Sequence, residues 1–179
     1  MADLLLGQVL SFTDDPFAVG PDAARHLSRG AVLVRAGKIA AVGEADTLRA
    51  AHPQAHVTDY GQCLISAGFI DAHVHYPQTA IIASWGKRLI DWLNSYTFPE
   101  EMRFADPAYG AEIADRYLNL VTAHGTTTVC TYTTIHPESV DAIYTAAQTR
   151  SMRLYAGKTC MDRNAPEGLR DTVQSAYDD

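Results

Sequence analysis

The sequence has few cysteines and no block of basic residues. Its three cysteines, Cys63, Cys130 and Cys160, lie far apart and form no C-x-x-C pair. This spacing argues against a disulfide framework and against a zinc site built from thiolates, and it fits a reducing compartment. Because there is no run of Lys or Arg and the formal net charge is −7, we expect no nucleic-acid or anionic membrane partner.

Long apolar runs and a secretion signal are also missing. No apolar stretch approaches the roughly 20 residues that a membrane-spanning helix needs. Near the N-terminus the chain carries Asp3, whereas a signal peptide has basic residues there. We therefore expect a cytoplasmic protein that binds no membrane.

What is present is an ordinary globular composition of 179 residues, 47% hydrophobic and 20% charged. This is enough for one domain or for part of a larger one. Residues 1–67 are β-rich, with a strand expected at 4–12 and a hairpin at 31–43. A polar loop is expected between them at 13–30, and a short helix at 44–52 ahead of a proline.

After residue 68 the pattern changes to alternating strands and helices. The first helix has Asp106 at its N-cap, Pro107 at its first position and Gly125 past its end, with an apolar stripe between them. The expected strands are 69–75, 126–134 and 153–161, and the expected helices are 107–124, 136–150 and 165–179. Three such strand–helix units predict an α/β fold with a parallel sheet covered by helices.

The number of units leaves two architectures open. A closed (β/α)₈ TIM barrel needs eight strands and about 250 residues, and this chain offers three strands. It is either a small open α/β sheet or the first part of a barrel that is incomplete here. Because the chain stops inside a predicted helix, we interpret it as the first part of a barrel.

The segment 68–79, GFIDAHVHYPQT, carries the clearest chemical signal. Side chains alternate along a strand, so Asp71, His73 and His75 are expected on one face, at the carboxyl end where barrel enzymes hold their active sites. Two imidazoles at this spacing suit Zn²⁺, or less well Fe²⁺. Such a pair also occurs by chance on exposed strands, but the apolar run before it and the strand–helix series after it favour a metal site. A catalytic zinc needs at least three protein ligands, so the pair is not a complete site.

These segments resemble the amidohydrolase superfamily, metal-dependent hydrolases built on a (β/α)₈ barrel. GFIDAHVH is similar to the signature of its first strand and HGTTTV (124–129) to its second-strand region. Residues 1–67 resemble part of its flanking β-sandwich domain, which leaves 68–179 as the first three units of the barrel. Within the superfamily the guanine deaminase family is the most similar, through HVHYPQT, LIDWLNSYTFPEEMRF (89–104), TIHPES (134–139) and GKTCMDRNAP (157–166).

The resemblance implies roles for individual residues. His73 and His75 would be two ligands of a single Zn²⁺, and His75 would also contact the substrate. Gln78 would hold the purine, because an amide can donate and accept at once. Trp92 and Leu93 would line the pocket. From its place deeper in the strand, Asp71 is better suited to support the imidazoles than to bind metal.

The implied reaction is the hydrolysis of guanine to xanthine and ammonia by a zinc-activated water, as part of purine catabolism. Guanine and water would be the substrates, and the family also implies a homodimer. In the family, two more histidines, an aspartate, an arginine and a proton-shuttling glutamate lie further along the chain, beyond the last residue here. We therefore expect no catalytic residue within this chain, and no deaminase activity from it alone.

Three alternatives stay open. The chain could belong to an aminohydrolase that acts on another heterocycle, or to a non-catalytic homologue that binds or scaffolds. His136 could contribute to the pocket, whereas His124 is expected to cap or pack at a helix end. Zinc deaminases of the cytidine type are excluded, because they need H-x-E and P-C-x-x-C motifs that this sequence lacks.

Overall fold

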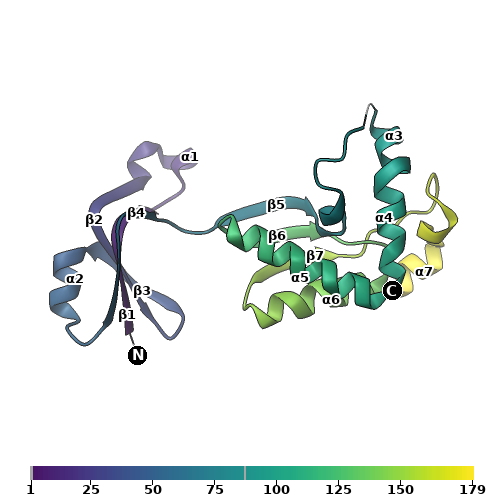
Figure 1. Cartoon of the computed structure of the whole chain (residues 1–179). Coiled ribbons are helices and arrows are strands. Elements are labelled where there is room, and N and C mark those ends of the chain that lie inside the picture. The colour runs from purple at the N-terminus through teal and green to yellow at the C-terminus, as the bar shows by residue number, and fades with distance from the viewer. Residues whose placement is uncertain (1, 87) are drawn as a thin grey trace. The chain divides into compact units, whose positions relative to one another are not determined.

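A computed structural model describes residues 2–86 and 88–179 (Figure 1). The chain divides into two compact units, one up to Ala67 and the other spanning Gly68–Asp179. None of the helices in the described residues is long and apolar enough to cross a membrane.

The first unit is a four-stranded sheet in the order β3-β2-β1-β4. Strand β1 runs antiparallel to β2 and parallel to β4, and a short helix, α2, packs Leu48 against the apolar cluster around Leu4 and Leu33. The strands are Ala2–Phe12 (β1), Ala24–Arg35 (β2), Lys38–Glu44 (β3) and His56–Ile65 (β4), and the helices are Pro16–Val19 (α1), Pro21–Ala23 (a 3₁₀ turn) and Ala45–Ala51 (α2).

The predicted hairpin at 31–43 is confirmed. Arg35 pairs with Lys38, and the two residues between them, Ala36 and Gly37, both have positive φ, 49° and 73°. Two positive φ values give the tight turn whose twist matches that of paired strands. The predicted loop at 13–30 is wrong in its second half, because β2 already begins at Ala24 and pairs there with β1. Its exposed polar side chains hid a strand whose backbone pairing decides the structure.

The second unit is a mixed α/β fold. Its parallel sheet has the order β5-β6-β7, and helices α5 and α6 connect the strands and cover one face (Figure 1). This confirms the predicted parallel sheet and its first two helices. The strands are Phe69–His75 (β5), Thr126–Tyr132 (β6) and Arg153–Gly157 (β7), and the helices are Pro107–Ala123 (α5) and Pro137–Thr149 (α6).

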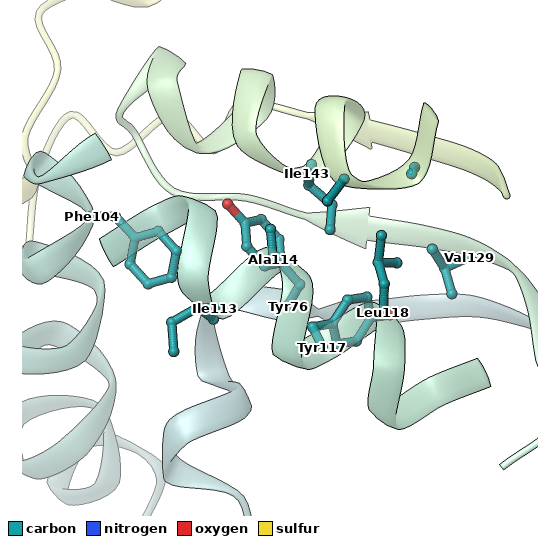
Figure 2. Close-up of a cluster of buried hydrophobic side chains, with 10 residues drawn as sticks. Tyr76, Phe104, Ile113, Ala114, Tyr117, Leu118, Val129 and Ile143 are labelled. Atoms are coloured by element: carbon teal, nitrogen blue, oxygen red, sulfur yellow. The ribbon is translucent and has the colours of Figure 1, made fainter. Parts of the chain in front are cut away.

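The core of the second unit lies between the sheet and these two helices. Figure 2 shows Tyr76 at its centre, fully buried, with its ring edge-on to Phe104. The Tyr76 hydroxyl donates to the carbonyl of Ser139 at 2.5 Å, and the Tyr76 backbone N–H donates to Thr131 Oγ1 at 3.0 Å. Tyr76 opens the 3₁₀ helix η2 (Tyr76–Ile81), so the segment directly after β5 is fixed in place. The cluster also includes Ile113, Ala114, Tyr117, Leu118, Val129 and Ile143.

A helical segment before α5 changes its hydrogen-bond pattern along its length. It runs through Leu89–Trp92 (α3), the π-helix Leu93–Thr97 (η3), Phe98–Met102 (α4) and the 3₁₀ turn Arg103–Ala105 (η4). The π turn ends two residues before Pro99, which has no backbone N–H with which to continue an α-helical ladder.

The third predicted helix, 165–179, is only partly correct. The structure has a 3₁₀ turn at Glu167–Leu169 (η5), an extended stretch, and a short helix at Val173–Asp178 (α7). The extended stretch is tied back to the segment after β7, because Asp171 N–H donates to the carbonyl of Met161 at 2.8 Å and Lys158 pairs with the Asp171 carboxylate at 2.9 Å.

Candidate metal and substrate site

His73 and His75 lie together at the carboxyl end of β5. Their ring centroids are 5.6 Å apart, and both rings contact Tyr132 at the end of β6. Tyr132 is the ladder partner of His75 and stacks on its ring, with centroids 4.7 Å apart and an interplanar angle of 19°. No pattern in the sequence marks Tyr132, because only the register between β5 and β6 brings it beside the pair.

The two imidazoles fit a shared metal ion. Rings bound to one Zn²⁺ at about 2.0–2.1 Å with tetrahedral angles have centroids about 5 Å apart, close to the observed spacing. Burial, and then the proximity of His73, lowers the pKa of His75, which favours the neutral ring that metals bind. Across residues 2–86 and 88–179, no group of three or more His, Cys, Asp or Glu side chains is placed to hold a metal. The described residues thus supply two ligands.

The expected common face of Asp71, His73 and His75 is wrong for Asp71. The β5–β6 ladder shifts register between Asp71 and Val74, which interrupts the strict alternation of side chains. Asp71 is the ladder partner of the fully buried Val129, on the face that the helices cover, whereas His75 pairs with the exposed Tyr132. Asp71 still contacts the site, because its Oδ1 accepts from the backbone N–H of His73 at 3.2 Å.

Gln78 and Trp92 join the two histidines around one cleft of about 500 Å³. Gln78 lies in η2, and its Nε2 donates to Glu101 Oε1 at 3.2 Å. Trp92 ends α3, and its indole N–H donates to the carbonyl of Ser84 at 3.1 Å. The other lining residues are Val74, Thr79, Ile81, Ile82, Ala83, Ser84, Tyr117, Leu120 and Val121. The structure therefore brings four predicted residues to one cleft.

Two predicted residues do not line this cleft. Leu93 is half-buried at the start of the π-helix, and Asp71 lies on the face of the sheet that the helices cover. Tyr117, for which no role at the site was predicted, does line the cleft. Tyr117 of α5 has a buried hydroxyl with no hydrogen-bond partner in the described part of the chain. Burial, and then the charge of Asp71, raises the pKa of Tyr117. Its place on an apolar helix stripe gave no signal beyond that of a core residue.

A close approach fixes the indole. A Cβ added to Gly86 would lie 2.5 Å from Cβ of Trp92. Only glycine leaves room for the chain to pass this near Trp92. Gly86 is thus packed directly against Trp92, which lines the cleft.

The remaining two histidines of this unit lie elsewhere. His124 is the C-cap residue of α5, and its Nδ1 is 2.8 Å from the carbonyl oxygen of Leu120, in accord with the expected capping role. His136 is the N-cap residue of α6, and its Nε2 is buried without a partner among the described residues. Burial is the main cause that lowers the pKa of His136. Neither histidine lines the cleft.

The chain is similar to one protein family over most of its second unit. Residues 64–178 match the amidohydrolase family, and residues 30–55 match a bacterial imidazolonepropionase-like composite domain. The chain is 40% identical over 165 residues to the guanine deaminase of Escherichia coli K12 and 39% identical over 167 residues to a probable guanine deaminase of Deinococcus radiodurans. These alignments include 92% and 90% of the chain but only 37% and 38% of the relatives.

The fold is also similar to those of solved guanine deaminases. The chain superposes on E. coli guanine deaminase with a TM-score of 0.90 at 37% identity, over 98% of this chain and 41% of that one. For the guanine deaminase of Bradyrhizobium japonicum the TM-score is 0.93 at 35% identity, over 99% and 39%. For the enzyme of C. acetobutylicum, solved with guanine bound in its active site, it is 0.85 at 26% identity, over 99% and 41%.

Proposed function

This chain belongs to the amidohydrolase family, and on that premise we propose that it forms part of an enzyme that hydrolyses guanine to xanthine and ammonia. The main support for the proposal is the cleft, which is lined by two neighbouring imidazoles and by the amide of Gln78. An amide of this kind can form hydrogen bonds with the edge of a purine. The substrate follows from the relatives, because several that match most of this chain are guanine deaminases.

Members of the amidohydrolase family bind a metal, and we assign its first two ligands here to His73 and His75. Imidazole nitrogens and a hydrolytic reaction favour Zn²⁺ over Fe²⁺. When bound, zinc lowers the pKa of water and so supplies a nucleophile near neutral pH. The Asp71 carboxylate accepts a hydrogen bond from the backbone N–H of His73, and the Tyr132 ring lies against both imidazoles.

The substrate would lie between Gln78 and Trp92. Gln78 still has an amide oxygen and a second N–H to offer a purine edge, and the flat indole of Trp92 can cover the base. His75 would contact the substrate beside the metal, and Leu93 would support Trp92 from the π-helix. Addition of water at C2 would form a C2–O bond, and the bond from C2 to the exocyclic amino nitrogen would then break. The amino group leaves as ammonia only after it gains a proton. We propose that the proton donor comes from outside this chain.

We also propose an architecture for the protein to which the two units belong. The first unit would be part of a β-sandwich, and the second would be the first three strand–helix units of a (β/α)₈ barrel. Support comes from the parallel sheet, the helix-covered face and the fold of the solved relatives. The enzyme would act in the cytoplasm in purine catabolism, as a homodimer.

The test is a chimaera in which this chain replaces the matching N-terminal part of the E. coli guanine deaminase. We expect it to release ammonia from guanine. Substituting His73→Ala or His75→Ala should remove bound zinc and lower kcat/KM by at least about 10²-fold, as expected when a metal ligand is lost. Ammonia release and zinc content are measured on the same samples.

The control is His56→Ala, which removes an exposed imidazole from the first unit. It should leave turnover and zinc content unchanged. A relative 30% identical over 180 residues is a 5-methylthioadenosine/S-adenosylhomocysteine deaminase, so 5-methylthioadenosine is assayed in parallel. Turnover of that compound in preference to guanine would contradict the proposed substrate.

A further inference from the structure

We propose that Glu101 is a positioning residue, which fixes the orientation of the Gln78 amide and so decides which hydrogen-bonding groups the cleft presents to a ligand. This inference deepens the proposed function and rests on the role given there to Gln78. Glu101 does not line the cleft; it acts on the ligand only through Gln78.

Glu101 is an unusual residue to bury. It lies in α4 and is only 6% exposed. Its neighbour Glu100 is equally buried but has two partners, an ion pair with Arg103 at 3.0 Å and a hydrogen bond from Tyr109. No ion pair reaches Glu101 from the described residues, and its one side-chain hydrogen bond comes from Gln78.

A buried carboxylate without a counter-ion is costly, and here burial raises the pKa of Glu101 while the bond from Gln78 opposes that rise. Packing does not require a carboxyl at such a position, because an apolar side chain of the same size would fill it at lower cost. Among the described residues, the bond from Gln78 is thus the interaction that a carboxylate at this position provides.

The chemistry of the two groups determines how Gln78 points. In the structure the NH₂ group of Gln78 donates to a carboxylate oxygen of Glu101, so the amide turns its NH₂ group and not its oxygen toward Glu101. The Gln78 oxygen and the second N–H are then left for a ligand. Without Glu101 the amide is free to turn by 180°, which exchanges the positions of its oxygen and its NH₂ group. A purine edge has donors and acceptors at fixed positions, so it binds only one of the two orientations well.

The rest of the Gln78 segment is already fixed. Tyr76 is bonded through its backbone to Thr131 and through its hydroxyl to Ser139, and Thr79 Oγ1 donates to the carbonyl of Tyr76 at 2.6 Å. With the backbone held, the remaining freedom at Gln78 lies in its side chain. Glu101 removes that freedom before a ligand arrives, which lowers the ordering cost of binding.

The first measurement uses the 179-residue chain labelled with ¹⁵N, and follows the side-chain NH₂ signals of Gln78, assigned by their loss in Gln78→Ala. One of the two protons should be shifted downfield and protected from exchange. Glu101→Met, which keeps the volume but cannot accept, should abolish the shift, and Glu101→Gln should reduce it. Glu100→Gln is the matched control, since it alters a buried glutamate of the same helix that does not touch Gln78. It should leave the signals in place.

The second measurement is the dissociation constant for guanine, followed on the same spectra. Glu101→Gln should weaken binding by about tenfold, the equivalent of one charge-assisted hydrogen bond. In a Gln78→Ala background the same substitution should have no further effect, because Glu101 acts through Gln78.

The two measurements separate the two proposals. If the wild-type chain shows no response to guanine, the proposed substrate is in doubt, while the NH₂ signals still decide the role of Glu101. Gln78 signals that stay at their wild-type positions in both Glu101 variants would overturn the inference. So would guanine binding that Glu101→Gln weakens equally with and without Gln78.

Discussion

At the scale of single residues, the buried pair of Lys158 and Asp171 offers the sharpest test of stability. Their side chains are 9% and 6% exposed, and Lys158 Nζ lies 2.9 Å from Asp171 Oδ1. Burial alone would lower the pKa of Lys158, but the hydrogen bond and charge of Asp171 raise it above its usual value. Lys158→Met should cost about 3–5 kcal/mol of unfolding free energy in urea titrations, because it leaves a buried charge without its partner.

The exposed pair of Arg88 and Asp91 is the comparison for this prediction. Its arginine side chain is 72% exposed, so Arg88→Met should lower the unfolding free energy far less than Lys158→Met does. Removing both buried charges, with Lys158→Met and Asp171→Leu together, should recover much of the loss. An equal loss of unfolding free energy in Lys158→Met and Arg88→Met would contradict the prediction and mean that water reaches the Lys158–Asp171 pair.

The candidate site shows what single residues can and cannot reveal in advance. His73 and His75 could be predicted to lie together because two residues at spacing two share a face of any regular strand. Asp71 could not, because a register shift separates it from them and no sequence pattern marks such a shift. The partners of Gln78 and Lys158 are 23 and 13 residues away, and only the folded chain pairs them.

At the scale of elements, helix α5 depends on its N-terminal cap. The Asp106 carboxylate accepts from the backbone N–H of Ala108 at 2.9 Å, ahead of Pro107 at the first helical position. Because α5 supplies Ile113 and Leu118 to the core, fraying at its start weakens the packing of the sheet. Asp106→Ala should lower the unfolding free energy by about 1 kcal/mol, measured by urea titration.

Asp106→Ser is the control for the cap. Serine is as good an N-cap as aspartate and differs mainly in charge, so this variant should stay within a few tenths of a kcal/mol of the wild type. If serine destabilises the chain as much as alanine does, the charge of Asp106 and not its hydrogen bond stabilises the helix.

The elements that could be predicted are those whose signals are local. Helices α5 and α6 each have a proline at the first position and an apolar stripe, and both were confirmed close to their predicted bounds. The start of β2 and the break in the last predicted helix depend on pairing with distant segments, β1 in one case and Met161 in the other. Periodicity carries no information about such partners.

At the scale of the whole molecule, the second unit has an open sheet. Within the described residues, β5 and β7 each pair with β6 alone, and Tyr132 and Tyr155 are exposed on the face that the helices leave bare. The α/β class and the parallel order could be predicted, because alternating strands and helices allow few other arrangements. We propose that further strands close this sheet into a barrel. The edges of β5 and β7 would then pair with those strands, and the bare face would be covered inside the barrel.

The open sheet also limits what the chain can do with a metal. The described residues place two imidazoles together and no third ligand beside them. We expect the 179-residue chain to bind Zn²⁺ through His73 and His75 with a free energy well below the roughly 10–16 kcal/mol of a four-ligand structural site. Competition with a chromophoric zinc indicator measures the affinity. The affinity should decrease as the pH is lowered, because protonated imidazole cannot bind metal.

Histidine variants test whether the zinc binds in the cleft. His73→Ala and His75→Ala should each abolish the binding, since one imidazole alone has little affinity, whereas His56→Ala and His124→Ala should not change it. Affinity in the range of a four-ligand site would contradict the prediction and mean that the chain gathers further ligands in solution. Weak binding that disappears with either cleft histidine is the expected result, because the described residues offer a metal two imidazoles from one strand and no third ligand.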